Sequence, residues 1–451
     1  MKKVNLISLV ILLFVLTFYS CKPKDDVDTP DATEGKEIIL SDNGSGIGTR
    51  TLYSDTTYLI SGLVFVNEGQ ELTIEAGTVL KGKPGTGENA SALIVARGGK
   101  INAVGTADAP IIFTCEADDL NGSINYNDRG LWGGIIILGK AKLNSTPGET
   151  AIEGIPTSEP RGIYGGTNDN DNSGTLKYIS IRHGGTDIGE GNEINGLTLG
   201  GVGSGTTIEY IEIVANKDDG VEFFGGTPQL KNILVAYCGD DSFDYDEGFR
   251  GKGQFWCAIQ DDSEGDRCGE HDGGTDPETA SPYATPQIYN ATYIGRGISE
   301  GKRVITFRDN AGGHYANSIF ANQGKGIDIE LLAGEGSFDR FQAGELTLKN
   351  NIFYNIADGT AENIFTISFG EGASANPDST NASSDFANYF ETAQNEVFDT
   401  GITATNPVPQ NSTGNNALAE YPADGFFETV NFKGAFGTGN WAEGWTLTFS
   451  N

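Results

Sequence analysis

An internal repeat constrains the fold of this chain more than any other feature of its sequence. Residues 208–224 (IEYIEIVANKDDGVEFF) align without gaps on residues 230–246 (LKNILVAYCGDDSFDYD), at an offset of 22 residues. A second pair of segments, 316–322 (ANSIFAN) and 349–355 (KNNIFYN), matches at an offset of 33 residues. Periods of this length indicate supersecondary units that stack and bury a continuous core.

The stacked units are predicted to be short β-strands. Apolar and polar residues alternate in runs such as 73–75 and 211–213, separated by Gly, Asn and Asp, and no long stretch has helical periodicity. Glycine supplies 64 of 451 residues, about twice its usual share, which suits a fold with many tight turns. A leucine-rich horseshoe is excluded because its ladder of Leu and Asn is missing. We therefore predict an all-β fold, a parallel β-solenoid.

The open ends of such a solenoid expose unpaired strand edges, which need caps. We expect an N-terminal cap over about residues 37–70 and a C-terminal cap with long loops over about residues 371–451, where the repeat is lost. A long polar segment, residues 258–287, is expected to protrude between rungs as a loop insertion. The predicted folded domain spans residues 37–451.

The N terminus has the features of an export signal. Residues 1–20 contain two lysines and an apolar stretch from Leu6 to Phe18, and Cys21 stands at the expected cleavage point. The stretch is shorter than the ~20 residues of a membrane-spanning helix, so we expect membrane attachment through a lipid on Cys21. Residues 21–36 are polar and acidic without apolar periodicity, which predicts a flexible tether.

The charge of the chain limits its partners. Its formal net charge is −33, and the signal peptide carries lysines but no acidic residue, so the mature chain is more acidic still. Such a surface repels nucleic acid and anionic lipid, and it repels polyanions unless cations bridge them. We expect no nucleic-acid partner, and we expect neutral glycans, cations or a partner protein as ligands.

Four segments carry a resemblance to a known family. They are ALIVARGGKINAVGTADAPIIFT (92–114), LWGGIIILGKA (131–141), GDDSFDYDEGFRGKGQFW (239–256) and FKGAFGTGNWAEGW (432–445). They resemble pectin-lyase-like β-helix lipoproteins of Bacteroidetes, over roughly Ile38 to the C terminus. The resemblance implies a single-stranded right-handed parallel β-helix, but it implies no particular activity.

A second resemblance concerns location. The acidic pair Asp25-Asp26 behind Cys21 resembles the surface-export signal of Bacteroidetes lipoproteins. It implies an outer-membrane lipoprotein exposed on the cell surface. The alternative is that these residues are only a solvated linker.

Two Asp-rich turns are the first candidate site. They lie one repeat apart, so their carboxylates should stack about 5 Å apart on one side of the β-helix. Three interpretations remain open: hydrogen bonds to turn N–H groups, a bound Ca²⁺ ion, or a carboxylate pair that catalyses glycoside hydrolysis. The candidate catalytic residues are Asp218, Asp219, Asp240 and Asp241, and the candidate metal ligands here are Asp240, Asp241, Asp244 and Asp246.

A second candidate calcium site is the segment 169–174, which has the pattern D-x-D-x-S-G. Asp169 and Asp171 would be the first ligands. Ser180 occupies the twelfth position, where a calcium loop has a bidentate glutamate. A plain Asn/Asp turn is the alternative.

Arg308 is the candidate base for a lyase reaction, in which a basic side chain removes a proton beside a uronic acid. Arg182 with His183, and Lys302 with Arg303, are weaker candidates. The alternative for each is a surface charge that balances acidic neighbours. A position of Arg308 toward the Asp-bearing face would favour the lyase.

Beyond Cys21 the chain has Cys115, Cys238, Cys257 and Cys268, and export would expose them to an oxidising compartment. Cys257 and Cys268 flank a short polar loop, so we expect a disulfide between them. Cys238 lies in an apolar run and is expected to be a buried thiol. Zinc is disfavoured because no C-x-x-C motif occurs.

Three functions are compatible with these features. The leading hypothesis is a non-catalytic binding or scaffold lipoprotein for glycan. The aromatic residues near the insertion could stack on sugar rings or pack in the core and turns of the β-helix; they are Phe255, Trp256, Tyr283 and Tyr289. The second is a Ca²⁺-dependent polysaccharide lyase or glycoside hydrolase. The third is a structural protein that binds another outer-membrane protein. The fold alone does not decide among them.

Overall fold

The computed structural model describes residues 36–189, 192–274, 277–370, 372–375, 377–411 and 417–450. Residues 1–35 are a unit separate from residues 36–451. The predicted signal peptide and Cys21 therefore lie outside the described residues, as does all of the predicted tether except Lys36. Within the described part of the chain, no helix is long and apolar enough to cross a membrane.

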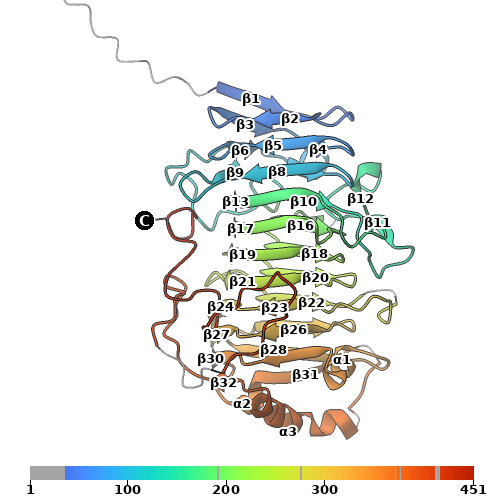
Figure 1. Cartoon of the computed structure of the whole chain (residues 1–451), viewed down its shortest axis with the longest axis vertical. Helices are drawn as coiled ribbons and strands as arrows, with labels where there is room; N and C mark the ends of the chain where they lie inside the picture. Colours follow the sequence, from blue (N-terminus) through green and yellow to red (C-terminus); the bar gives the residue numbers. More distant parts are fainter. Residues whose placement is uncertain are drawn as a thin grey trace, which may run out of the picture. The chain divides into compact units, whose positions relative to one another are not determined.

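Two long parallel sheets, sheet A and sheet B, form the walls of a β-helix (Figure 1). Sheet B takes one strand from each rung in chain order, which is the expected result of a coil that repeats about every 22 residues. Its strands are β4 (Leu63–Val66), β7 (Ala92–Val95), β10 (Ile135–Leu138), β16 (Leu197–Gly200), β18 (Val221–Phe224), β20 (Phe243–Asp246), β22 (Gly269–Asp272), β25 (Arg303–Arg308), β28 (Lys325–Leu331) and β31 (Phe365–Phe369).

The chain turns a corner within each rung of sheet A. In some rungs the corner separates two short strands, and in the next rung it lies inside one long strand, whose two halves pair with those short strands. The long strand bends at Tyr178, whose backbone is left-handed (φ 49°). The strands are β1 (Lys36–Leu40), β2 (Arg50–Leu52), β3 (Thr56–Ile60), β5 (Glu71–Ile74), β6 (Val79–Gly82), β8 (Lys100–Val104), β9 (Ile111–Cys115), β13 (Gly174–Arg182), β17 (Thr207–Val214), β19 (Gln229–Ala236), β21 (Lys252–Ile259), β23 (Gln287–Tyr289), β24 (Thr292–Gly297), β26 (Gly313–Ala316), β27 (Ile319–Gln323), β29 (Leu346–Lys349), β30 (Ile352–Ile356) and β32 (Glu396–Val397).

Smaller elements lie outside these walls. Two antiparallel pairs are β11 (Glu149–Ala151) with β12 (Ile163–Gly165), and β14 (Asp187–Gly189) with β15 (Asn192–Glu193). Short 3-10 turns cover Gly87–Asn89 and Pro160–Gly162. The helices are α1 (Ser337–Ala343), α2 (Ala361–Ile364) and α3 (Pro377–Thr392).

The repeat alignment is confirmed as strand register. Ile211 pairs with Ile233 between β17 and β19, and Val221 pairs with Phe243 between β18 and β20. The offset of 33 is likewise a register, since β26 and β27 pair with β29 and β30. The all-β parallel β-helix predicted from the sequence is therefore the observed fold.

The interior is a continuous apolar core. Aromatic rings stack along it: Trp256 lies 5.6 Å from Phe223 and 4.7 Å from Phe243, centroid to centroid, with nearly parallel planes. Trp256 belongs to β21 of sheet A, whereas the two phenylalanines belong to β18 and β20 of sheet B, so the stacking joins the two walls across the core. These offset contacts add about 0.5–1.5 kcal/mol per pair to the stability from burial alone.

The predicted N-terminal cap is wrong as a separate element, because β1 to β4 within residues 37–70 pair in parallel with the rungs that follow. At the other end, the predicted C-terminal cap contains a helix. Helix α3 packs Phe386 and Phe390 against Phe365 and covers the last rungs. The predicted insertion 258–287 includes β22, a regular strand of sheet B, so it is not one continuous loop.

The predicted C-terminal cap has a second part. Residues 417–450, called the strap below, run back along the outside of sheet A, as the dark red segment of Figure 1 shows. Left-handed corner asparagines hold its first half: Asn317 bonds both ways with Ala419, and the Asn290 amide donates to the Phe432 carbonyl (2.9 Å). Asparagine tolerates the left-handed backbone of the corner and offers its amide outward.

Candidate functional site

The Asp-rich turns connect sheet A to sheet B on successive rungs. Strand β17 ends at Val214, a residue with left-handed backbone follows, and β18 begins at Val221 after the turn that carries Asp218 and Asp219. The turn between β19 and β20 carries Asp240 and Asp241 in the same way. Because the flanking strands pair in register, the two turns lie directly side by side.

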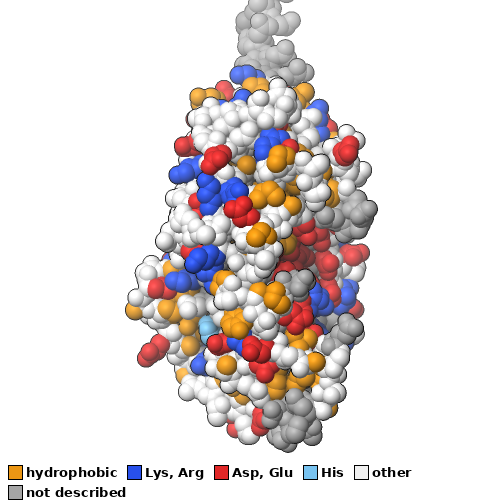
Figure 2. All heavy atoms as spheres, turned by 90° about the vertical axis from the view of Figure 1, so that its right-hand side faces the viewer, with side chains coloured by type: hydrophobic (Ala, Val, Ile, Leu, Met, Phe, Trp, Pro, Cys, Tyr) orange, Lys and Arg blue, Asp and Glu red, His pale blue; other side chains and the backbone are white. Residues whose placement is uncertain are grey.

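These turns line a cavity of about 360 Å³. Figure 2 shows the acidic side chains gathered in a hollow on this face of the molecule. Among the described residues that line it, all are acidic except one asparagine: Glu153, Glu193, Asn195, Asp218, Asp219, Glu222, Asp240, Asp241, Asp244 and Glu270. We call this cavity the acidic groove.

Two of the aspartates hold the turns together. The Asp219 carboxylate accepts a hydrogen bond from the backbone N–H of Asp241 (2.8 Å), and the Asp241 carboxylate accepts one from the backbone N–H of Arg267. Both side chains are nearly fully buried, with 7% and 1% exposed. The structural interpretation of the Asp-rich turns, hydrogen bonds to turn N–H groups, therefore holds for the second aspartate of each pair.

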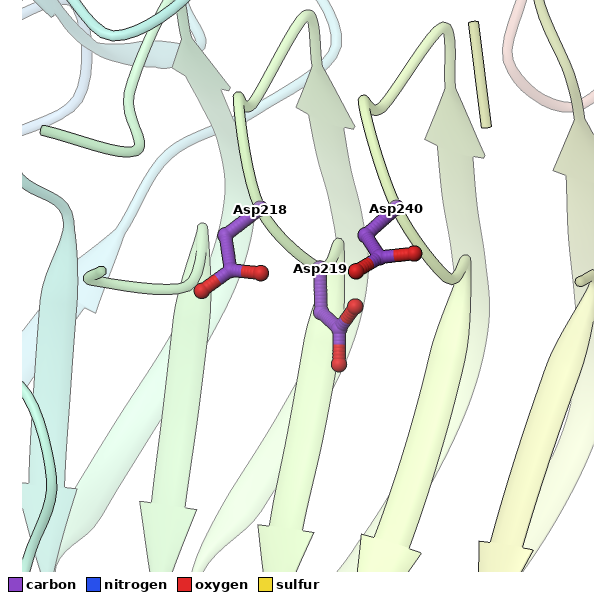
Figure 3. A group of neighbouring side chains, drawn as sticks. All are labelled: Asp218, Asp219 and Asp240. Atoms are coloured by element: carbon purple, nitrogen blue, oxygen red, sulfur yellow. The ribbon is translucent and has the colours of Figure 1, made fainter. Parts of the chain in front are cut away.

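Carboxylates of the groove also converge on one another. One oxygen each from Asp218, Asp219 and Asp240 lies within 4.8 Å of the other two, and Figure 3 shows these side chains meeting from two successive turns. Oxygens of Asp219, Glu222 and Asp244 form a second such group. The Asp244 Oδ1 atom is buried without a hydrogen-bond partner among the described residues. A hard cation would satisfy that atom, so the donor set fits Ca²⁺.

The pKa values of the groove carboxyl groups agree with a site for Ca²⁺. Burial, followed by repulsion from Glu153, Glu193 and Asp240, raises the pKa of Asp218 to about 7. Burial and neighbouring carboxylates also raise the pKa values of Asp219 and Asp244 well above their ordinary range. The metal-free groove therefore holds protons near neutral pH, and a divalent cation would compete with them.

Arg308 lies beside the groove. It pairs with Glu270, which lines the groove (3.0 Å), and with Asp272 (2.6 Å). Burial lowers the pKa of Arg308, but these ion pairs outweigh burial and raise the pKa above its ordinary value. Arg267 is held in the same way by Glu270 (2.7 Å) and Asp266 (2.8 Å). Both guanidinium groups stay charged, so they suit anion binding and not proton removal.

The remaining candidate bases lie elsewhere. Arg182 is buried and donates from Nε to Ser180 (2.7 Å). His183 is also buried, and burial lowers its pKa. Arg303 pairs with Asp328 (3.1 Å). Lys302 pairs with Asp266 (2.9 Å) at the edge of the Asp-rich turns.

The second calcium candidate is not part of the groove. Asp169 is paired with Arg250 (3.0 Å) and accepts the Lys142 N–H, and Asp171 accepts the Lys140 N–H (3.0 Å). These bonds brace a loop, as the plain-turn alternative proposes. Asp246 is also absent from the described groove lining, although it was a candidate ligand together with Asp240, Asp241 and Asp244.

The predicted disulfide is wrong in this structure. Cys257 and Cys268 are free and fully buried, as Cys115 and Cys238 are buried and free. The reason is strand alternation: Cys268 belongs to the interior core, whereas Cys257 belongs to the outer cluster covered by the strap. Thiols that pack in two different clusters do not face each other as the geometry of a disulfide requires.

Sequence reasoning missed part of the groove. Glu270 pairs with Asp244 in register, and Asp244 pairs with Glu222, so these three form a ladder along sheet B. Glu270 follows Asp244 by 26 residues and not by 22, because the turn before β22 is longer, so the repeat offset does not lead to it. Glu153 and Glu193, the latter in β15, lie outside the two walls, and no repeat signal points to them.

The fold and site define a parallel β-helix protein with a carboxylate-lined groove at the turns between its two sheets. The chain belongs to the family described as pectate-lyase like beta helix domain, whose model matches residues 46–446. No match was found among curated proteins or among solved structures.

Proposed function

We propose that the protein is a Ca²⁺-dependent, non-catalytic polysaccharide-binding protein, anchored at the cell surface through a lipid on Cys21. The observation that carries the proposal is the acidic groove, whose described lining contains nine carboxylates and no basic side chain. So many carboxylates in one cavity repel each other, and a divalent cation offsets that repulsion.

The proposed Ca²⁺ ion determines which kind of polysaccharide suits the groove. Ca²⁺ takes six to eight oxygen ligands, and the groove opens to solvent, so positions remain for oxygens of a bound polymer. Uronate carboxylates and sugar hydroxyls are oxygen ligands of this kind. Arg308, charged and held beside the groove by Glu270, adds a group that pairs with a uronate carboxylate. A uronate-containing polysaccharide is therefore the ligand that we propose.

The binding hypothesis is preferred to the lyase because the basic side chains near the groove are held in their charged form by ion pairs. A lyase base must be deprotonated when it acts. Arg267 and Arg308 each contact two or more carboxylates, which favour the charged form.

One observation favours a glycoside hydrolase as the second candidate. A carboxyl group with a pKa near neutrality is suited to donate a proton to a leaving group, and Asp218 has a pKa of about 7. Asp240 lies within 4.8 Å of it, oxygen to oxygen, and would be the partner carboxylate.

The aromatics near the predicted insertion give no support to sugar stacking there, because they pack inside the molecule: Trp256 is fully buried, Phe255 packs on Phe432, and Tyr289 packs on Phe427. The polysaccharide proposal therefore rests on the acidic groove. The structural role, binding to another outer-membrane protein, stays the third hypothesis.

Affinity electrophoresis tests the binding proposal. The purified chain is run through gels containing polygalacturonate, alginate or a neutral glucan, each with Ca²⁺ or with EDTA. Retardation by a uronate polymer that requires Ca²⁺ and is lost in Asp218→Asn/Asp240→Asn is the expected result. Retardation that is equal in EDTA, or unchanged in the double variant, would overturn the proposal.

Anchoring is tested separately. Cys21→Ala should move the protein from the membrane fraction to the soluble fraction of the cells that express it. Surface exposure predicts that an added protease degrades the wild-type chain on intact cells. Retention of the variant in the membrane fraction would contradict the lipid anchor.

A further inference from the structure

A second cavity lies where the C-terminal segment meets the outer wall of the β-helix. Its volume is about 540 Å³, which falls within the ~300–1,000 Å³ of small-molecule sites. We call it the strap pocket. The residues that line it are Tyr237, Ala404, Thr405, Asn406, Val408, Gln410, Thr438, Gly439, Asn440, Glu443, Thr448, Phe449 and Ser450.

The chemistry of the strap pocket differs from that of the acidic groove. Its described lining combines two aromatic rings, Tyr237 and Phe449, with amide and hydroxyl side chains, and Glu443 is the single charged residue among them. Aromatic faces pack on the C–H faces of sugar rings, while amides and hydroxyls donate to and accept from sugar hydroxyls. This mixture suits a neutral polyhydroxylated ligand and offers nothing specific to an anion.

An exposed aromatic extends the pocket. Tyr126 is 58% exposed, and its ring centroid lies 5.1 Å from that of Tyr237. An exposed tyrosine held against a second ring adds apolar area beside the pocket, where a ligand longer than one sugar ring would continue.

The wall of the pocket is held in place before any ligand arrives. Glu212 is fully buried in sheet A, and its carboxylate accepts hydrogen bonds from the backbone N–H groups of Leu447 (2.9 Å) and Thr448 (2.8 Å). The Thr448 hydroxyl donates to the same carboxylate (2.8 Å). Phe449 follows directly, so the backbone beside its ring is held by these hydrogen bonds. Such preorganisation lowers the entropy cost of binding.

We propose that the strap pocket binds a neutral saccharide of one or two rings, stacked on Tyr237 and Phe449, without a metal ion. The site is independent of the acidic groove in its chemistry, although Tyr237 precedes Asp240 by only three residues in the same turn. The same turn thus contributes to both cavities. The acidic groove would bind a cation and an anionic sugar, and the strap pocket would bind a neutral sugar.

Isothermal titration calorimetry of the purified chain in EDTA tests this inference. The probes are glucose, galactose, mannose, N-acetylglucosamine, cellobiose and lactose. At least one probe should bind, and Phe449→Ala and Tyr237→Ala should each weaken it about tenfold, which corresponds to one lost stacking contact. Tyr126→Ala, at an exposed position where folding is not affected, should weaken a disaccharide more than a monosaccharide. The matched control is Tyr53→Ala, an exposed tyrosine elsewhere, which should bind as the wild type does.

Every outcome of this titration either supports or overturns the inference. Absence of binding by every probe at concentrations up to about 20 mM overturns the inference, because a preformed sugar site reaches millimolar affinity. Binding that requires Ca²⁺, or that is lost in Asp218→Asn/Asp240→Asn and kept in Phe449→Ala, places the sugar in the acidic groove and also overturns it. Should Phe449→Ala unfold, as its circular dichroism would reveal, Tyr126→Ala and Tyr237→Ala carry the same test.

Discussion

The Asp219 carboxylate accepts a hydrogen bond of 2.8 Å from the backbone N–H of Asp241, which lies one rung further along the β-helix. The bond joins two turns that no strand pairing connects. It also divides the aspartates of each pair into two kinds: all four line the groove, but the second aspartate of each pair in addition braces the next turn. The second carboxylate of the dipeptide therefore serves both the groove and the fold.

This division predicts unequal effects of substitution. Asp219→Ala should lower the free energy of unfolding by about 1–3 kcal/mol even in EDTA, since it leaves a buried N–H unsatisfied. Asp240→Asn should leave stability in EDTA unchanged or higher, because it removes repulsion. Urea unfolding followed by circular dichroism measures both. Equal destabilisation by the two variants would contradict the division of roles.

Calcium should stabilise the folded chain. At a free Ca²⁺ concentration 100 times Kd, one site adds about 2.7 kcal/mol to the free energy of unfolding. Asp244→Asn should lose most of that gain while being no less stable in EDTA, because Asp244 Oδ1 has no hydrogen bond to lose among the described residues. Thermal unfolding with Ca²⁺ and with EDTA measures the difference.

Asp171→Asn is the matched control for this calcium experiment, since Asp171 belongs to the other candidate calcium segment. It should keep the full response to Ca²⁺. Loss of the response in Asp171→Asn, with Asp244→Asn unaffected, would move the calcium site to residues 169–174.

The pH dependence of stability follows from Asp218. Its pKa is raised from 3.8 to about 7 by burial and by nearby carboxylates, so between these values the folded chain binds more protons than the unfolded chain. Stability in EDTA should therefore be greatest at the low end of this window and should fall as the pH rises through about 7. Asp218→Asn should flatten the profile, and Asp108→Asn, at an exposed position, should not. A wild-type profile that rises from pH 5 to 8 in EDTA would contradict the raised pKa.

The four buried thiols should be unreactive in the native chain. Burial raises the pKa values of Cys257 and Cys268 above the ordinary thiol range, and it raises that of Cys238 to about 12. Because the thiolate is the reactive form, a thiol reagent should label these residues only after unfolding. Peptide mapping without reduction should find no link between Cys257 and Cys268. A linked peptide would show that the disulfide forms after all.

The repeat made the architecture predictable. Side chains alternate between core and surface along each strand, so the offset between 208–224 and 230–246 predicted both the fold and the register, including Ile211 opposite Ile233. It also brought Asp218 and Asp240 together. A stacked coil converts sequence distance directly into spatial distance, which is why this part succeeded.

Features that depend on distant contacts were not predictable in the same way. The position of the strap depends on its hydrogen bonds to Asn317 and Glu212, each more than 100 residues away from its partner in sequence. Glu153 and Glu193 reach the groove from segments outside the two walls that no repeat governs. The Cys257–Cys268 disulfide failed because closeness in sequence says nothing about which side of a strand each thiol occupies.

The most direct test of the proposed function is size-exclusion chromatography with light scattering on the purified chain mixed with polygalacturonate in Ca²⁺. It measures the bound protein and the length of the polymer together. We expect the protein to co-elute with polymer of unchanged length, and to separate from it in EDTA or when Asp218→Asn/Asp240→Asn is used. Polymer that becomes shorter with the wild type but not with Asp218→Asn would show that the groove is an active site, and failure to co-elute in Ca²⁺ would contradict polysaccharide binding by the acidic groove.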